Sequence, residues 1–436
     1  MKLRFYLSLI IAKFSYIFLK VTKLSSGTAI IGLLTLKICP DFLKYVSTYI
    51  KKTKINITGT NGKTTTSGLI SHLLKKSGKR IVTNSEGANM LNGIINTLAT
   101  KICPIRPFEY SVIETDEAFL EKVYGKFNGD YLLVTNLFED QTDRFANPVY
   151  TKTLIQKGID KNPEVQLILN ADEPISASLK SNKASIYFGI NNVFNSEGNL
   201  VEYEKNSFKC PVCEQDMSYS KNFYSQQGHY SCNCGYKRQT PKYLADVKLY
   251  DKHIEISLKD EVFNIPLVGL YNAYNALGAI ALAKELGIEN INANLKTFKV
   301  AFGRSEKRLL NGHDTLIQLI KNPAGTNEVL KTVDLNSNIL IAINNNIADG
   351  KDISWIEQVN FERLADVNKE CIVTGLCAEE IKQRLIKAGV KNTKLIPNIK
   401  EAVSYLSKIA DGNITILTTY TALLKIDKIK EIRKCY

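Results

Sequence analysis

The stretch KINITGTNGKTTTSGLISHLL, Lys54–Leu74, decides the fold class of this chain. Ile55 and Ile57 alternate with polar residues as in a strand, a glycine-rich turn follows, and the run from Thr64 onward has the pattern of a helix. The backbone N–H groups of such a turn, and of the helix that follows it, bind phosphate. Lys63 would then reach the β- and γ-phosphates of ATP, and Thr64 would ligate Mg2+.

Two observations argue against a phosphate-binding role for this turn. Ile57 stands where the first glycine of a standard Walker A motif would be, and a Gly-Lys-Thr turn also arises by chance. Strand, turn and helix signals nevertheless agree with one another, which favours an ATP site at this point of the chain.

Charge is concentrated at the N-terminal end. The formal net charge is +14, and residues 1–54 hold ten Lys/Arg and one acid, Asp41, so +9 of it lies there. The remaining chain is nearly balanced and carries no aromatic-basic RNA motif or recognition-helix signature, which argues against nucleic acid as a partner. With 436 residues, 44% of them hydrophobic, the chain is long enough for two or three domains with cores of their own.

The N-terminal run MKLRFYLSLIIAKFSYIFLKVTK is basic and apolar. Lys13 and Lys20 break its apolar part into runs too short to span a bilayer, and no A-x-A-like cleavage site follows. Two interpretations stay open. The segment either rests on an anionic membrane surface or packs on its own domain with its lysines in water.

Four of the nine cysteines form a cluster in two close pairs: Cys210, Cys213, Cys232 and Cys234. The pattern CPVC, 18 residues, CNCG is typical of a zinc ribbon, in which two thiolate pairs complete a tetrahedral site. Disulfides are the alternative, but an ATP site in the same chain favours a reducing compartment and a metal. The second pair departs from the commoner Cys-x-x-Cys spacing. We interpret the zinc as structural, holding together a small insertion.

The phosphate-binding stretch GTNGKTTT resembles that of the Mur ligases and folylpolyglutamate synthetases. Three further stretches fall where this family has its motifs: SVIETDEA with Glu114, GLYNAYNALGAIALA with two asparagines, and AFGRSEKR with Arg304 and Glu306. The resemblance implies that Thr64 and Glu114 hold Mg2+. It also implies a set of nucleotide-binding residues: Gly59, Thr60, Asn61, Gly62, Lys63, Thr64, Thr65, Glu114, Asn272, Asn275 and Arg304.

Within that family the chain resembles the ligase-like subunits of lipid II isoglutaminyl synthases. The similarity rests on TNLFEDQTDRF, the four-cysteine insertion, KNPAGTNEVL, ADGKDISW and TTYTALL, and it covers most of the chain. Two positions depart from the pattern, with Asn345 in place of an expected aspartate and Glu357 in place of a tryptophan.

This resemblance implies ATP-dependent amidation of the α-carboxylate of D-glutamate in lipid II, through an acyl phosphate, to give D-isoglutamine. No Cys-His motif of a glutaminase occurs here. The resemblance implies that a GatD-like glutaminase subunit, in a heterodimer with this chain, supplies the ammonia. The reaction would take place in the cytoplasm, and a location at the inner face of the membrane stays open. Two other functions stay open: an ordinary Mur or folyl ligase that joins an amino acid to a carboxylate, and a scaffold that only binds ATP.

Two acids in ADGKDISW are candidates for a separate role. Asp349 follows the apolar strand NILIAIN, at the kind of strand end where α/β folds carry functional groups, whereas Asp352 stands two residues before Ser354 and is suited to capping a helix. A Cys-His glutaminase needs a third group to orient its imidazole. The resemblance implies that the ligase-like subunit supplies this acid, with Asp349 as first choice and Asp352 as second.

The expected architecture is therefore α/β, with three parts. Residues 1–48 form a basic N-terminal segment, residues 49–297 a Rossmann-type, Mur-ligase-like ATPase domain with the zinc ribbon inserted at about 203–240, and residues 298–436 a smaller C-terminal α/β domain. In that last part the apolar runs NILIAIN, ECIVTGL and NITILTT alternate with helical patterns, as parallel βαβ units do.

Overall fold

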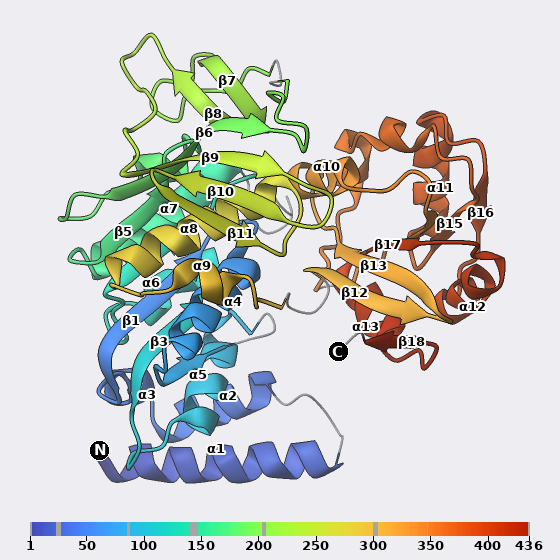
Figure 1. The fold of residues 1–436 in the computed structure, drawn as a ribbon. Coiled ribbons are helices and arrows are strands. Elements are labelled where there is room, and N and C mark those ends of the chain that lie inside the picture. Colours follow the sequence, from blue (N-terminus) through green and yellow to red (C-terminus); the bar gives the residue numbers. More distant parts are fainter. Residues whose placement is uncertain are drawn as a thin grey trace. The chain divides into compact units, whose positions relative to one another are not determined.

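The computed structural model describes residues 2–22, 28–84, 88–139, 147–202, 206–299, 304–346 and 348–434. It divides into two compact units (Figure 1). Unit 1 comprises Met1–Phe138, Pro148–Pro266 and Asn272–Phe298, and unit 2 comprises Glu139–Asn147, Leu267–Tyr271 and Lys299–Tyr436. The domain boundaries expected at 48/49 and 297/298 stay predictions.

Unit 1 is built on a nine-stranded sheet in the order β11-β10-β9-β6-β5-β4-β1-β3-β2. Seven of these strands run parallel: β1 Ile50–Thr58, β2 Ile81–Thr83, β3 Phe108–Glu114, β4 Tyr131–Val134, β5 Gln166–Asn170, β6 Ile186–Phe194 and β9 Tyr243–Leu249. At one edge β10 Ile254–Leu258 and β11 Glu261–Ile265 continue antiparallel. The last four residues of β1 are all buried, as expected for a parallel sheet covered on both faces.

The helices of unit 1 follow the strands in chain order. The longer ones are α4 Lys63–Lys76, α5 Leu91–Lys101, α7 Pro148–Lys161 and α8 Leu270–Glu285, of which the first two residues belong to unit 2. The short ones are η1 Glu117–Phe119, α6 Leu120–Val123, η2 Ser176–Ser178 and α9 Ile291–Leu295. The predicted strand and helix around the glycine-rich turn are thus β1 and α4.

The N-terminal segment folds as three helices, α1 Lys2–Thr22, α2 Thr28–Ile38 and α3 Phe42–Ser47. Phe5 and Leu9 of α1 are buried in the same hydrophobic cluster as Phe42 of α3 and Ile94 of α5. One side of α1 is therefore part of the core of unit 1.

The cysteine-rich insertion lies between β6 and β9. It carries its own two-stranded antiparallel sheet, β7 Ser218–Tyr224 and β8 Gln227–Ser231, and a small cluster of buried Cys210, Met217 and Tyr230. The start of the predicted insertion, residues 203–205, is outside the described residues.

Unit 2 is built on a seven-stranded sheet in the order β16-β15-β14-β17-β13-β12-β18. The strands are β12 Arg304–Leu310, β13 His313–Leu319, β14 Asn338–Ala342, β15 Cys371–Thr374, β16 Thr393–Leu395, β17 Ile414–Thr418 and β18 Ile432–Lys434. Strands β13 to β17 pair in parallel, and β12 pairs antiparallel with β13 on one side and with β18 on the other. The three apolar runs expected to form parallel strands are β14, β15 and β17, so this prediction is confirmed.

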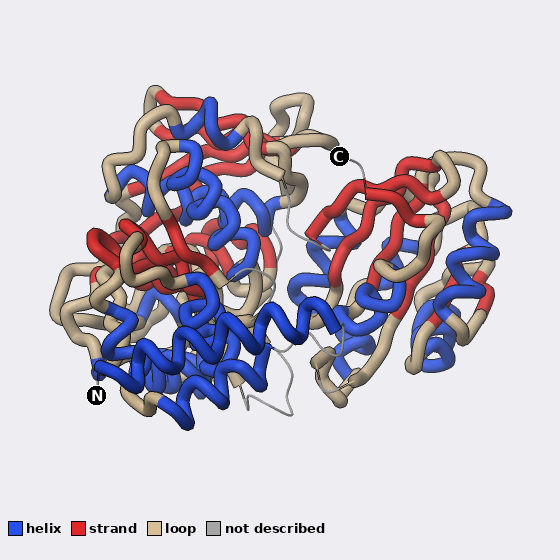
Figure 2. The backbone as a smooth tube through the Cα atoms, turned by 90° about the horizontal axis from the view of Figure 1, so that it is seen from below, coloured by secondary structure: helices blue, strands red, loops and turns tan. Residues whose placement is uncertain are grey.

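Helices cover both faces of the second sheet, as its alternating strand residues require (Figures 1 and 2). Ile339 and Ile341 pack in one cluster with α10 Pro323–Lys331 and α11 Ala378–Lys387. Leu340 and Ala342 pack in the other, with helices α12 and α13. These span Ile399–Ile409 and Tyr420–Ile426, and two short 3-10 helices, η3 Ser354–Gln358 and η4 Phe361–Leu364, follow β14.

Candidate nucleotide site

The turn between β1 and α4 has a backbone that only glycine suits at two positions. Gly59 has φ 120° and Gly62 has φ 85°, both in the left-handed region. A Cβ on Gly59 would lie 2.3 Å from Thr135 Oγ1, and one on Gly62 would lie 1.9 Å from Asn275 Oδ1. The two glycines therefore allow the turn to pass close beneath its neighbours, as a phosphate-binding loop must.

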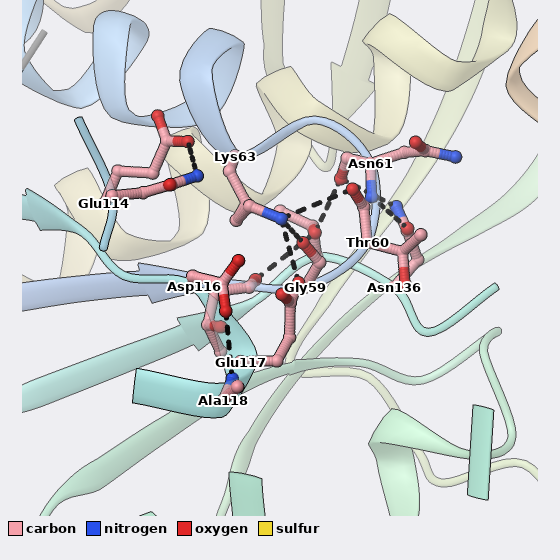
Figure 3. A network of polar contacts seen from close by, with 12 residues as sticks. Gly59, Thr60, Asn61, Lys63, Glu114, Asp116, Glu117, Ala118 and Asn136 are labelled. Atoms are coloured by element: carbon pink, nitrogen blue, oxygen red, sulfur yellow. Dashed lines mark hydrogen bonds and ion pairs between the residues drawn. The ribbon is translucent and has the colours of Figure 1, made fainter. Parts of the chain in front are cut away.

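The loop after β4 holds this turn in place. Thr60 N–H donates to the Asn136 carbonyl at 2.8 Å, and Asn61 N–H donates to Asn136 Oδ1 at 2.9 Å (Figure 3). The Thr135 hydroxyl donates to the Asn61 carbonyl at 2.7 Å, and Phe138 N–H donates to Thr60 Oγ1 at 3.2 Å. The conformation of the phosphate-binding turn is thus fixed by a loop some 75 residues away in sequence.

Lys63 opens helix α4 and is buried against acids. Its Nζ donates to Glu117 Oε1 at 2.8 Å and also to the Gly59 carbonyl (Figure 3). Burial alone would lower the pKa of Lys63, but the charges of Glu117, Glu114 and Asp116 outweigh burial and raise it above its usual value. The ammonium therefore stays charged at neutral pH, ready for phosphate oxygens.

Thr64 and Glu114 meet beside Lys63. The Thr64 hydroxyl donates to Glu114 Oε2 at 2.9 Å, while Glu114 Oε1 accepts from Asn89 Nδ2 at 3.0 Å. Neighbouring ligands of an octahedral Mg2+ at about 2.1 Å lie about 3 Å apart, so the spacing of these two hard oxygen ligands fits this ion. Glu114 reaches this place because it ends β3 and pairs in the parallel ladder with Ile57 of β1.

The two predicted asparagines lie on α8. Asn272 and Asn275 are both buried, and Asn275 Nδ2 donates to Asn272 Oδ1 at 3.2 Å. Asn275 also packs directly on Gly62, so α8 is brought against the phosphate-binding turn. The predicted Arg304 is the first residue of β12 in unit 2, and its side chain is outside the described residues.

The structure brings together residues that the sequence did not single out. Glu117 pairs with Lys63, and Asn136 clamps the turn. Both lie within stretches that were quoted for their resemblance, and both follow the carboxyl end of a strand next to β1. That position was the available signal.

The four cysteines converge in the ribbon. Their Sγ atoms all lie within 4.8 Å of one another, with 3.7 Å between Cys210 and Cys234 and 3.5 Å between Cys213 and Cys232. A disulfide needs about 2.05 Å, whereas tetrahedral zinc with Zn–S bonds of about 2.3 Å sets sulfurs about 3.8 Å apart. The geometry therefore fits a single tetrahedral metal ion and not two disulfides.

The ribbon hairpin also reaches the nucleotide site. Gln226, at the turn between β7 and β8, donates through Nε2 to the Leu137 carbonyl at 2.8 Å and to Glu173 Oε1 at 2.5 Å. Glu173 is buried and accepts from Leu137 N–H at 3.2 Å through its other oxygen. Leu137 lies between Asn136 and Phe138, which bind the phosphate-binding turn. The insertion thus supports the loop that supports the turn.

A second anchor joins the ribbon to the sheet. The Arg238 guanidinium, after β8, donates through Nε to Asp172 Oδ1 at 2.6 Å. Asp172 Oδ2 accepts from the Ile190 N–H at 2.7 Å and from the Tyr274 hydroxyl of α8 at 2.8 Å. Asp172 therefore ties the ribbon to α8, the helix that carries Asn272 and Asn275.

In unit 2, Asp349 lies on the loop after β14 and is buried. Its Oδ1 accepts from Thr421 N–H at 2.7 Å, and its Oδ2 accepts from the Thr421 hydroxyl. Asp352 Oδ1 accepts from Ser354 N–H at 2.8 Å at the start of η3. Asp352 thus binds the first residue of this short 3-10 helix, whose N-cap residue is Ile353, and Asp349 holds the N-terminal end of α13.

A phosphate-binding turn after the first strand of a mainly parallel sheet, followed by a second α/β unit, defines an ATP-binding ligase of the Mur type. Residues 57–283 match the Mur ligase middle domain, and residues 319–423 match the MurT ligase C-terminal domain. The chain belongs to the MurT family of the Mur ligases.

Individual relatives agree with this assignment. Subunit MurT of the glutamine-hydrolyzing lipid II isoglutaminyl synthase from Staphylococcus aureus (strain COL) is 33% identical over 414 residues, 91% of each chain. The same subunit from Streptococcus pneumoniae is 30% identical over 425 residues, 95% of this chain and 94% of the relative.

Solved structures share the fold. The pseudomurein peptide ligase type C from Methanothermus fervidus has a TM-score of 0.65 at 24% identity, covering 87% of this chain and 79% of its own. MurF from Acinetobacter baumannii has a TM-score of 0.64 at 14% identity, covering 90% and 80%. The fold of the Mur ligases is therefore present here, and with it the expectation of ATP and Mg2+.

The contact between ribbon and turn makes a testable prediction. Gln226→Ala leaves the buried Leu137 carbonyl and Glu173 without their partner, so the free energy of unfolding in urea should fall by about 1–3 kcal/mol. ATP affinity, measured by calorimetric titration, should fall as well. Gln215→Ala, at an exposed position of the same ribbon, is the matched control. Equal stability of the two variants would show that the contact does not support the site.

Proposed function

We propose that this chain is the ATP-using subunit of an enzyme that amidates the α-carboxylate of D-glutamate in lipid II to D-isoglutamine. The observation that carries the proposal is the union, in one chain, of a Mur-type phosphate-binding turn with a MurT C-terminal domain. The MurT subunits from S. aureus and S. pneumoniae, which match over nine tenths or more of this chain, are named as parts of lipid II isoglutaminyl synthases.

The chemistry assigned to unit 1 is activation of the carboxylate. A carboxylate oxygen attacks the γ-phosphorus of ATP, ADP leaves, and an acyl phosphate forms; ammonia then attacks the acyl carbon and phosphate leaves. Lys63 balances charge on the transferring phosphoryl group, which is where such catalysis gains most. Mg2+, held by Thr64 and Glu114, would supply further charge neutralisation. We assign nucleotide contacts to the residues of the turn, Gly59, Thr60, Asn61, Gly62 and Thr65, and to Asn272, Asn275 and Arg304.

We assign the supply of ammonia to a GatD-like glutaminase in a heterodimer with this chain. The state of Cys377, in the stretch TGLCAEE after β15, supports this assignment. Its burial, with the charges of Glu380 and Asp349, raises the pKa of the thiol to about 11. Little thiolate therefore exists at neutral pH, and a thiol in this state is a poor nucleophile.

Asp349 is our candidate for the acid that orients the catalytic histidine of the glutaminase, with Asp352 as second choice. The two hydrogen bonds from Thr421 fix the direction of the Asp349 carboxylate. Orientation before the partner arrives is what such a role requires.

We also propose that the four-cysteine cluster binds Zn2+ as a structural ion. We further propose that the enzyme acts at the inner face of the membrane, because a lipid-linked substrate and cytoplasmic ATP are both accessible there.

The activity itself can be tested with the purified chain, ATP, lipid II and ammonium. We expect a carboxamide product, which is slightly lighter than the substrate, whereas an ordinary ligase would add the mass of a whole amino acid when one is supplied. Lys63→Ala should abolish turnover, because its charge is needed as the phosphoryl group transfers. Lys75→Ala, in the last turn of the same helix, should behave as the parent. Substantial turnover by Lys63→Ala would refute the site, and ATP binding without any product would favour the scaffold function.

A substitution of Asp349 should affect glutamine-dependent amidation and leave ammonium-dependent amidation intact. We expect Asp349→Asn, in complex with the glutaminase, to keep ammonium-dependent amidation and to lose glutamine-dependent amidation by a factor on the order of 10^2 or more.

Two control variants accompany Asp349→Asn. Thr421→Val removes the hydroxyl that donates to Asp349 and accepts from Asn344 and Asn346. It leaves the carboxylate and its bond from Thr421 N–H, so most glutamine-dependent activity should remain. Asp352→Asn tests the second choice. Loss of both activities in Asp349→Asn would indicate a structural role, and retention of both would move the assignment elsewhere.

Metal analysis of the purified chain tests whether the four-cysteine cluster binds zinc. We expect close to one zinc per chain, and we expect the double variant Cys210→Ser, Cys213→Ser to lose both the zinc and its solubility, because binding of a structural ion contributes directly to folding. Cys103→Ser, outside the cluster, should retain the metal. A zinc-free chain with full activity would contradict a structural role for zinc.

A further inference from the structure

The outer side of α1 carries a continuous apolar stripe. Its members are spaced alternately four and three residues apart, which places them on one face of a helix. All of them are between 47% and 80% exposed: Leu3, Leu7, Ile10, Phe14, Ile17 and Val21. We name this set the α1 stripe. Figure 2 views the protein from below and shows α1 from the side, over its whole length.

The opposite side of the same helix is packed. Phe5, Leu9 and Ala12 are buried in the core of unit 1, and the Phe5 ring stacks on Tyr49 with centroids 5.5 Å apart. By helical periodicity these residues lie about half a turn away from the α1 stripe. The helix is thus apolar on two opposite sides, and its own fold covers only one of them. An exposed apolar stripe of this length marks an interaction surface.

Basic side chains border the stripe. Lys2, Lys13 and Lys20 lie on one line along the helix, because eleven and seven residues separate them, and Arg4 lies on the other flank. The first acidic residue of the chain is Asp41, so no acid occurs on α1 or α2. An apolar face with a border of only positive charge matches the chemistry of an anionic lipid surface, with acyl chains beneath and acidic headgroups beside it.

A second copy of the chain fits this surface less well. A seam with three-four spacing can pair two helices, but such seams are normally bordered by charges of both signs, which attract across the pair. Two α1 helices would instead bring their positive borders together.

Crossing the membrane is also disfavoured. Within the described ranges α1 alone is long and apolar enough to span a bilayer by length and composition. To do so it would have to withdraw Phe5, Leu9 and Ala12 from the core of unit 1. A helix that lies in the plane of the interface uses both of its faces without that loss.

We propose that the α1 stripe, with its basic border, docks this protein on an anionic membrane surface. This inference deepens the proposed function, since a lipid-linked substrate would be met on that surface. It rests on the composition of the helix face and not on the reaction.

The test is flotation of the full chain with vesicles, without ATP or lipid II, so that its failure would leave the proposed reaction untouched. The chain should float with phosphatidylcholine vesicles that contain about one third phosphatidylglycerol, and much less with pure phosphatidylcholine or at high salt. The double variant Ile10→Glu, Phe14→Glu should lose binding at least about tenfold. Val262→Glu is the matched control at an exposed apolar position, on the edge strand β11, and should bind as the parent does.

A second pair of variants tests the charge. Lys13→Gln and Lys20→Gln should each weaken binding to the anionic vesicles about fivefold and leave the apolar stripe intact. Thermal unfolding and ATP binding of every variant should match the parent, which separates loss of docking from loss of fold. Binding of the double glutamate variant at the level of the parent would overturn the proposal. The proposal would also be overturned if the parent chain did not bind the vesicles and instead formed dimers that the double glutamate variant does not form.

Discussion

The parallel pairing of β1 with its two neighbours is the constraint on which the candidate site depends. β1 pairs with β3 on one side and β4 on the other, with Ile57 opposite both Glu114 and Leu133. Parallel strands end at the same edge of a sheet, so the glycine-rich turn, the candidate magnesium ligand Glu114 and the clamping loop after β4 all lie in one place. Without this register the turn would keep its glycines but would lose its contacts with the loop after β4 and with Glu114.

Helix α8 and the four-cysteine insertion extend this arrangement. Helix α8 packs Asn275 on the turn, and the ribbon reaches the same loop through Gln226 and reaches α8 through Asp172. The four-cysteine insertion is therefore more than a separate appendage, because two independent anchors connect it to the candidate nucleotide site. Buried, fully bonded carboxylates such as Asp172 and Glu173 make these anchors specific, since an unpaired partner in such a place is costly.

The sequence predicted those features that depend on neighbours along the chain. The strand-turn-helix around Gly59–Lys63, the four-cysteine spacing and the apolar strands of unit 2 are local patterns, and all were found where expected. Glu117, Asn136 and Gln226 were missed, because each acts on residues far away in sequence. The same limit applied to Asp349: ADGKDISW and TTYTALL were both noted, yet only the parallel pairing of β14 with β17 brings Asp349 to Thr421. Likewise, sequence left open whether α1 packs or faces a membrane, whereas the structure gives the helix one packed side and one exposed side.

The central claim is that this chain activates a carboxylate with ATP while another subunit frees the nitrogen. It is tested most directly by following the amide nitrogen of isotopically labelled glutamine into lipid II, with the chain alone and with its co-purified glutaminase. We expect nitrogen from labelled glutamine to enter the α-carboxamide of D-isoglutamine only when both subunits and ATP are present, and the chain alone to incorporate nitrogen from labelled ammonium. Transfer of label from glutamine by the chain alone, or a product enlarged by a whole amino acid, would contradict it.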